Sequence, residues 1–237
     1  MKKWIAIGSS LVFSLASAQA GKIPSAQVVD SGSFGVYLNG KRVATETFKI
    51  EQRADGSSAH SELKSQDGVA QKSDMELTPT GDLVRYTWQE LQPMKAELSI
   101  NPTDEFLTEK VSASAEGKAY TVPHLLALST PILDDNFFLH REILMWRYLA
   151  TCTRKPQGLE CSAAPQQFGV LVPAQHLSES VTIDYKDKEK ISLKGHEMEC
   201  NTFVMQTDNG DWLLYLDSQQ KLVRIVGAGQ SLEVDRD

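Results

Sequence analysis

The sequence predicts a mainly β protein, in which a curved antiparallel meander forms an open or half barrel wrapped around one apolar helix. Two observations lead to this fold class. Over most of the chain, short runs of alternating apolar and polar residues are separated by turn dipeptides, as in strands that are buried on one face. A single, largely apolar block at residues 122–150 interrupts that pattern. Because a soluble protein must bury such a block, we expect the sheet to curve around it.

Residues 1–20 have the composition of a secretory signal peptide. Two lysines precede a short apolar core, and alanines stand at the small-residue positions before the expected cut after Ala20. The apolar core is shorter than the roughly 20 residues needed to cross a bilayer. No cysteine that could carry a lipid anchor lies near the cut. We therefore expect residues 21–237 to form a single half-barrel-like domain that is exported, soluble and periplasmic.

The chain is acidic, which limits its partners. It has 24 Lys and Arg residues against 31 Asp and Glu, a formal net charge of −7. Loss of the two signal-peptide lysines leaves 22 against 31, or −9. Such a chain lacks the basic surface that attracts nucleic acid or an anionic membrane surface. We expect no nucleic-acid partner and no membrane span.

The N-terminal half is expected to be a meander of neighbouring strands. In residues 34–38 alternate side chains are apolar, and the Asn39-Gly40 pair that follows favours a hairpin turn because both residues tolerate positive φ. The return strand is residues 42–53, and Asp55-Gly56 offers a second turn of the same kind. Further strands are predicted at residues 75–78, 83–91, 95–100 and 107–113.

After the apolar block the strand pattern returns. The expected strands are residues 168–172, 181–185, 191–193, 198–206, 212–216 and 222–226. The mixed-charge run at residues 184–190 is predicted to be a solvated turn. About ten strands in one domain must close, form a sandwich or curl, because open sheets of that size twist strongly.

The apolar block is expected to open with an extended or irregular segment bracketed by Pro123 and Pro131. A helix then begins at Asn136, with Asp134 or Asp135 as its N-cap. When residues 137–150 are placed about 100° apart around a helix, the only polar strip is a narrow one with His140 and Arg147. The helix is therefore covered on most sides rather than laid on a surface. Its apolar clusters are Phe137, Leu144 and Tyr148; Phe138, Met145 and Leu149; and Leu139, Ile143, Trp146 and Ala150.

At this point the chain resembles the LolA/LolB-type lipoprotein carriers, exported proteins with a half-barrel fold. The shared features are an export signal, Gly35-Val36-Tyr37 followed by Gly40 and Phe48 in the opening strands, and an apolar helical segment in mid-chain. The closing run from Trp212 to Asp217, a short turn, and the run from Lys221 to Ile225 also resemble that family. The resemblance implies a curved sheet that is capped by helices and encloses an apolar cavity for acyl chains.

The sequence thus favours a soluble exported protein that holds a hydrophobic ligand, a lipid or acyl group, between sheet and helix. The alternative is a structural or protein-interaction module with a fully packed interior, and an envelope protein is a possible partner in either case. His140 and Arg147 could meet a carboxylate or phosphate head group at a cavity mouth, although two solvated side chains are the simpler reading. Candidate ligand-contacting residues are Trp88, Phe137, Phe138, His140, Leu144, Met145, Trp146, Arg147, Leu149 and Trp212.

Signatures of catalysis are not found. The mature chain has no G-x-S-x-G, H-E-x-x-H, P-loop or C-x-x-C motif, and no two histidines have helical metal-ligand spacing. We expect no enzyme activity, cofactor or metal. Export permits a disulfide. Cys152 with Cys161 would close a short loop, and a bond from either of them to Cys200 remains an alternative.

Overall fold

The computed structural model describes residues 26–237 apart from residues 94, 114–117, 156–157 and 228–230. The expected signal peptide, residues 1–20, lies outside the described residues. Fourteen strands of the described chain form one antiparallel sheet, and two short strands form a separate hairpin. Over these residues the fold is mainly β with one α-helix, as predicted.

The N-terminal half of the sheet is a meander in which each strand pairs with the next. At its first turn Asn39 and Gly40 have φ values of 51° and 73°, which confirms the predicted Asn-Gly hairpin. Gly56 opens β3 with φ 152°, and a Cβ atom there would lie 2.1 Å from the carbonyl oxygen of Leu77. The strands are β1 Gln27–Leu38, β2 Lys41–Arg53, β3 Gly56–Ser65, β4 Ala70–Leu77, β5 Leu83–Gln92, β6 Glu97–Thr103, β7 Phe106–Ala113 and β8 Tyr120–Ala127.

The C-terminal half follows the helix α1, Leu139–Leu149, and a small hairpin. A second meander then runs from β11 to β16, again with each strand beside the next. A short 3₁₀ turn, η1 Pro173–Gln175, connects its first two strands. The remaining elements are β9 Thr153–Lys155, β10 Gly158–Glu160, β11 Gln166–Val172, β12 Leu177–Leu193, β13 His196–Thr207, β14 Gly210–Leu216, β15 Leu222–Gly227 and β16 Leu232–Arg236.

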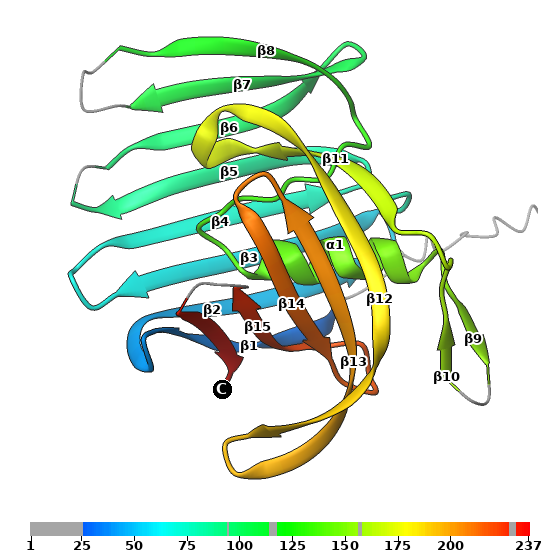
Figure 1. Ribbon diagram of the computed structural model, residues 1–237. Helices are drawn as coiled ribbons and strands as arrows, with labels where there is room; N and C mark the ends of the chain where they lie inside the picture. Colours follow the sequence, from blue (N-terminus) through cyan, green and yellow to red (C-terminus); the bar gives the residue numbers. More distant parts are fainter. Residues whose placement is uncertain (1–25, 94, 114–117, 156–157, 228–230) are drawn as a thin grey trace, which may run out of the picture.

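The first and last strands join the two meanders into one sheet. β16 pairs with β1 in antiparallel register, with Val234 opposite Val36. The outer edges of the sheet are then β8 and β11, which do not pair with each other, so the barrel is open. Figure 1 shows the sheet curving around α1, which lies between β2–β4 and β12–β14. The predicted half barrel around a helix is confirmed.

The helix is enclosed, as its apolar clusters predict, but its start and its cap differ from the expectation. It begins at Leu139 rather than Asn136, and Asp134 accepts a hydrogen bond from the Asn136 amide in the turn before it. The helical amides of Phe138 and Leu139 donate instead to the carboxylate of Glu46 on β2, at 2.7 and 3.2 Å. A residue 92 positions away caps this helix, which no local pattern could indicate.

Several strands were not predicted from the sequence. β3 has mainly small and polar residues, and only Ala59 and Ser61 of its central part face the interior fully buried. The extended lead-in around Pro123 is the edge strand β8, where a missing backbone donor is tolerated. β16 and the hairpin β9–β10 are short elements without a clear alternation.

The prediction of a turn at the mixed-charge run, residues 184–190, is wrong. These residues form the middle of β12. Its partners lie on β13, where Lys188 is opposite Asn201 and Lys190 opposite Glu199. These charged side chains are largely exposed, so the run is solvated although it is a strand. The true turn is Lys194-Gly195, where both residues have positive φ. Backbone pairing with β13 and exposed polar contacts such as the ion pair of Lys188 and Glu199 hold this run, which explains its missing apolar alternation.

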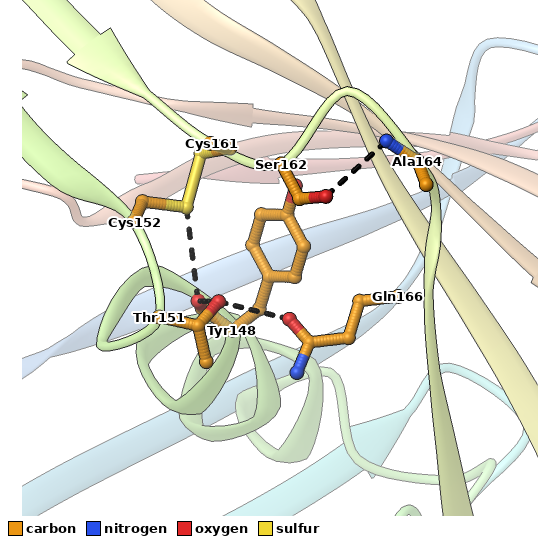
Figure 2. The surroundings of a disulfide bond; sticks show 7 residues. All are labelled: Tyr148, Thr151, Cys152, Cys161, Ser162, Ala164 and Gln166. Atoms are coloured by element: carbon orange, nitrogen blue, oxygen red, sulfur yellow. Dashed lines mark hydrogen bonds between the residues drawn. A yellow bond between two sulfur atoms is a disulfide. The ribbon is translucent and has the colours of Figure 1, made fainter.

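A disulfide closes a short loop of the chain just after the helix. Cys152 is bonded to Cys161, which confirms the local pairing, and Cys200 is a buried free thiol. Figure 2 shows that the same region is held by Thr151, whose hydroxyl donates to the carbonyl of Tyr148 at 2.7 Å and contacts Gln166 at 2.8 Å. The C-terminal end of α1 is therefore tied covalently and by hydrogen bonds to the segment that leads into β11.

Candidate functional site

An apolar pocket of about 370 Å³ lies between α1 and the inner face of β2–β4. The strands contribute alternate, inward-facing side chains, among them Ile50 on β2, Ala59 on β3 and Met75 on β4. The helix contributes Ile143 and Leu144. Small-molecule sites are typically cavities of roughly 300 to 1,000 Å³ with mainly apolar walls, and this pocket falls in that range.

The mouth of the pocket is formed by loops and by the end of the helix. The turn between β4 and β5, with Pro79 and Thr80 exposed, forms one side. Thr130 and Pro131, which precede the helix, form another. Half-exposed Val29 at the start of β1 also lines the opening. The pocket therefore opens to solvent at this end of the barrel.

Two helix residues at the mouth are held by backbone carbonyl groups. Trp146 donates its indole N–H to the carbonyl of Gln220 at 2.7 Å, which anchors the ring to the turn between β14 and β15. Arg147 donates from Nη1 to the carbonyl of Ser129 at 2.6 Å. Arg147 is the only charged residue among the described residues that line the pocket.

The structure brings three of the ten candidate ligand residues to this pocket: Leu144, Trp146 and Arg147. Trp88 lines a separate, smaller pocket of about 140 Å³ near His176. The other six are buried elsewhere and do not line the pocket: Phe137, Phe138, His140, Met145, Leu149 and Trp212. The candidates are residues of the helical segment and two tryptophans outside it, so sheet residues such as Ala59 and Met75 were missed. The period of two in β4 could mark Met75 as inward-facing, but nothing in the sequence distinguishes Met75 or Ala59 from the other inward-facing residues.

His140 does not reach solvent, so the interpretation that His140 and Arg147 are two solvated side chains is wrong for His140. It is buried, and its Nδ1 accepts a hydrogen bond from the backbone amide of Asp134 at 3.1 Å. That bond places the ring proton on Nε2, which faces the hydroxyl of Ser73 at 3.4 Å. Burial, and to a lesser degree the charge of Arg141, lowers the pKa of His140 to about 3. A general base needs a free lone pair toward the serine, so this pair is not an activated nucleophile.

Glu46 combines burial with three hydrogen bonds. Its carboxylate accepts from the Ser61 hydroxyl at 2.5 Å in addition to the two helical amides. Burial raises the pKa of Glu46 to about 7 against the opposing effect of these bonds. Because all three of these hydrogen-bond partners belong to β3 and to the start of α1, Glu46 serves to position the helix on the sheet.

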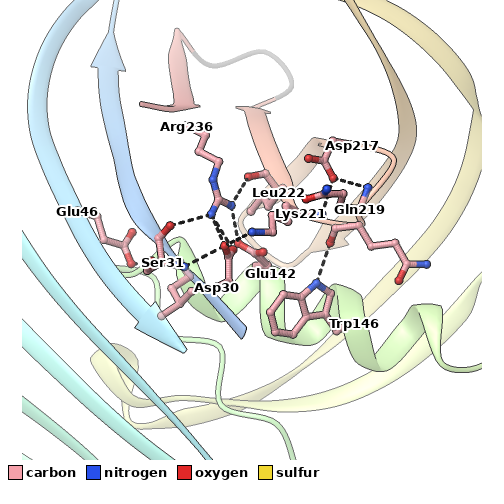
Figure 3. A network of polar contacts seen from close by, with 12 residues as sticks. Asp30, Ser31, Glu46, Glu142, Trp146, Asp217, Gln219, Lys221, Leu222 and Arg236 are labelled. Carbon is pink, nitrogen blue, oxygen red and sulfur yellow. Dashed lines mark hydrogen bonds and ion pairs between the residues drawn. The ribbon is translucent and has the colours of Figure 1, made fainter. Parts of the chain in front are cut away.

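A second buried carboxyl group, Glu142, anchors the middle of the helix (Figure 3). Its carboxyl oxygen lies 3.5 Å from Nη1 of Arg236 on β16. Arg236 and Lys221 also contact Asp30 on β1, at 2.6 and 2.7 Å. Burial, and then the neighbouring Asp30 carboxylate, raise the pKa of Glu142 to about 9. Burial acts in the same direction on Asp30, but the bonds to Arg236 and Lys221 outweigh it and keep the pKa of Asp30 below its ordinary value. At neutral pH Glu142 is therefore the protonated member of this cluster.

Arg141 is a further ionisable residue of α1 that is buried. Its guanidinium carbon lies 5.2 Å from the ring centre of Phe138 and 4.9 Å from that of Trp212. Nη2 of Arg141 lies 3.8 Å from Oδ1 of Asp135. Cation–π contact with two rings offsets part of the cost of burying this charge. Together with Glu46 and Glu142, Arg141 attaches α1 to the interior of the barrel on several sides.

The described residues show neither a metal-binding cluster nor a spanning helix. No group of three or more His, Cys, Asp or Glu side chains in this part of the chain is placed to hold a metal ion. No helix of the described residues is long and apolar enough to cross a membrane.

Comparisons with known proteins inform the fold. No protein-family model matches the chain, and no curated protein matches its sequence. Among solved structures, the chain is similar to the crystal structure of a beta-barrel-like protein of the domain of unknown function DUF1849 from Brucella abortus. The TM-score is 0.51 at 8% sequence identity, over 89% of this chain and 97% of that chain. At this identity the likeness shows a barrel-like fold and no more.

Proposed function

We propose that the protein is an exported, periplasmic binding protein that holds a hydrophobic ligand, a lipid or acyl group, in the pocket between α1 and β2–β4. The observation that carries the proposal is the pocket itself, about 370 Å³ with apolar walls from both sheet and helix. Residues 1–20, with the composition of a signal peptide, support the export. The resemblance to LolA/LolB-type carriers in the opening and closing strands is consistent with the same kind of ligand.

An acyl chain suits this space for a simple energetic reason. Each methylene group that moves from water into an apolar environment contributes about 0.8 kcal/mol. The pocket walls from Ile50, Met75, Ile143 and Leu144 are apolar and close to the barrel interior. A preformed pocket also lowers the cost of ordering the protein on binding.

The alternative, a module with a fully packed interior, is less well supported. A fully packed interior would leave no space of this size beside the helix, since protein cores contain few voids larger than a water molecule. A catalytic role is also less well supported, because the buried groups Glu46, Glu142 and His140 are engaged in holding the helix.

A pocket-filling substitution tests the proposal. Ala59→Trp places an indole ring in the pocket, where there is room for it, and Ala54→Trp makes the same change in the exposed turn after β2. Titration with the apolar fluorescent probe N-phenyl-naphthylamine should show saturable binding to the wild type and to Ala54→Trp. The affinity for the probe should fall about tenfold or more in Ala59→Trp. This is the loss expected when apolar surface of the probe equal to roughly two methylene groups is no longer buried in the pocket.

Circular dichroism and thermal unfolding of the three proteins show whether Ala59→Trp is folded. Equal probe binding by a folded Ala59→Trp variant would contradict the proposal, because the ligand would then bind elsewhere. Should Ala59→Trp fail to fold, Ile143→Glu makes the same test from the helix side, since Ile143 is a half-buried wall residue.

A further inference from the structure

We propose that the ligand is an amphiphile with an anionic head group, and that Arg147 binds this head group at the mouth of the pocket. This inference rests on the proposed function and specifies its ligand class. The apolar chain would lie along Ile50, Met75 and Ile143, and the head group would face solvent beside the last turn of α1.

The charge of the pocket is the first support. Arg147 is its only charged residue among those described, in a protein with 31 acidic and 24 basic residues. The remaining polar residues at the opening, such as Gln52, Ser57 and Thr130, are neutral. A lone cation beside an apolar cavity of an acidic protein favours an anion over a cation or a neutral group.

The hydrogen bonding of Arg147 is the second support. One nitrogen, Nη1, is held by the carbonyl of Ser129, which restricts the guanidinium to one place. In the described residues Arg147 forms no ion pair with a carboxylate, and its one hydrogen bond to the protein is that of Nη1. The side chain is half-buried and lines the pocket, so an anionic head group at the opening lies within reach of its remaining donors. A guanidinium with a free edge matches the two oxygens of a carboxylate or phosphate.

The neighbouring end of the helix does not prevent anion binding. Carbonyl groups at a helix C-terminus carry partial negative charge, which would repel an anion. Here the carbonyls of Trp146, Tyr148 and Leu149 accept hydrogen bonds from the amides of Ala150, Thr151 and Cys152. Their repulsion of a nearby head group is therefore reduced, and the full charge of Arg147 outweighs it.

The simpler interpretation is that Arg147 only braces the segment before the helix through Ser129. The two interpretations predict different head-group selectivity. If Arg147 only stabilises the segment before the helix, the protein should not distinguish ligands by the charge of their head group. Three amphiphiles with the same chain separate them: dodecanoate, dodecanol and dodecyltrimethylammonium. Each is titrated by displacement of N-phenyl-naphthylamine, below the concentration at which it forms micelles, against wild type, Arg147→Gln, Arg147→Lys and Arg154→Gln. Arg154 is an exposed arginine on β9 and controls for the loss of one positive charge.

For wild type and Arg154→Gln we expect dodecanoate to bind about tenfold or more tightly than dodecanol, as one charge-assisted hydrogen bond provides. Dodecyltrimethylammonium should bind most weakly. In Arg147→Gln the preference for dodecanoate over dodecanol should disappear. Arg147→Lys should keep part of the preference, because it keeps the charge and loses the planar fork.

Two results would overturn the inference in different ways. If dodecanol and dodecanoate bind wild type equally, or if Arg147→Gln keeps the preference for dodecanoate, the head-group assignment is wrong and the apolar pocket stands. If none of the three amphiphiles binds and the probe does not bind either, the proposed function fails together with the inference.

Discussion

Replacement of Glu142 by Gln should make the protein more stable, and increasingly so as the pH rises. The ordinary pKa of a glutamate is 4.5, and in the folded protein burial and Asp30 raise the pKa of Glu142 to about 9. Between these two values the folded state binds one more proton than the unfolded state. The free energy of unfolding therefore falls with rising pH in this window. Gln resembles the protonated carboxyl group and does not titrate, so the variant lacks this loss.

The magnitude follows from the proton linkage. One proton corresponds to about 1.4 kcal/mol per pH unit, so wild type should lose about 3 kcal/mol relative to Glu142→Gln between roughly pH 6 and pH 8. Glu46, with a pKa raised to about 7, lowers stability in the same direction as the pH rises from 4.5. His140, with a pKa lowered to about 3, contributes stability that is lost as the pH falls below 6.5. Both groups are present in both proteins, and their effects cancel in the difference.

Urea unfolding at a series of pH values, followed by circular dichroism, measures this difference. Glu199→Gln, at a carboxylate with 57% of its side chain exposed on β13, controls for the change of residue type and should show a nearly constant difference from wild type. If wild type and Glu142→Gln change in parallel from pH 6 to pH 8, Glu142 is not the protonated member of the cluster and the reasoning about its surroundings is wrong.

Three further predictions concern how the helix is held. Phe138→Ala should cost about 3 to 5 kcal/mol in the free energy of unfolding, because Phe138 is a buried core residue; an unchanged melting temperature would instead indicate a removable lid. Glu46→Ala should cost about 2 to 4 kcal/mol in urea unfolding, because it leaves two helical amides and the Ser61 hydroxyl buried without an acceptor; a loss below about 0.5 kcal/mol would refute the cap. Replacing Cys152 and Cys161 together by Ser should cost roughly 2 to 3 kcal/mol under oxidising conditions, and the difference should vanish when wild type is reduced.

The sequence predicted the parts of this fold that follow from local patterns. Alternation identified most strands, and Asn39-Gly40 identified the first hairpin, because positive φ at both residues is a local requirement. The helical clusters of residues 137–150 predicted an enclosed helix, since only a sheet on several sides can bury them. The local disulfide was one of the stated pairings.

The errors share one cause, which is long-range contact. The helix begins at Leu139 because Glu46, far away in the sequence, accepts its first amides. β12 continues through its charged residues because β13 pairs with its backbone there, whatever the side chains are. His140 is polar in the pattern, yet Asp134 and Ser73 provide the hydrogen bonds that permit its burial.

For the candidate site, the sequence pointed to the helix and not to the sheet. The helix half of the pocket, Leu144, Trp146 and Arg147, was among the candidates. The strand half was not, because Ala59 and Met75 differ in no visible way from other inward-facing residues until the sheet is assembled. Which side of an enclosed helix is packed and which faces a cavity depends on that assembly.

The central claim is that the pocket between α1 and β2–β4 holds an apolar guest. Native mass spectrometry of protein isolated gently from the cells that produce it tests this most directly, with Ala59→Trp and Ala54→Trp prepared in the same way. For wild type and Ala54→Trp we predict a mass above that of the bare polypeptide, because a bound guest adds to it, and we predict that collisional heating releases this guest. For Ala59→Trp we predict the mass of the bare polypeptide. Bare polypeptide for all three proteins under several mild conditions, or the same bound mass in all three, would contradict the claim.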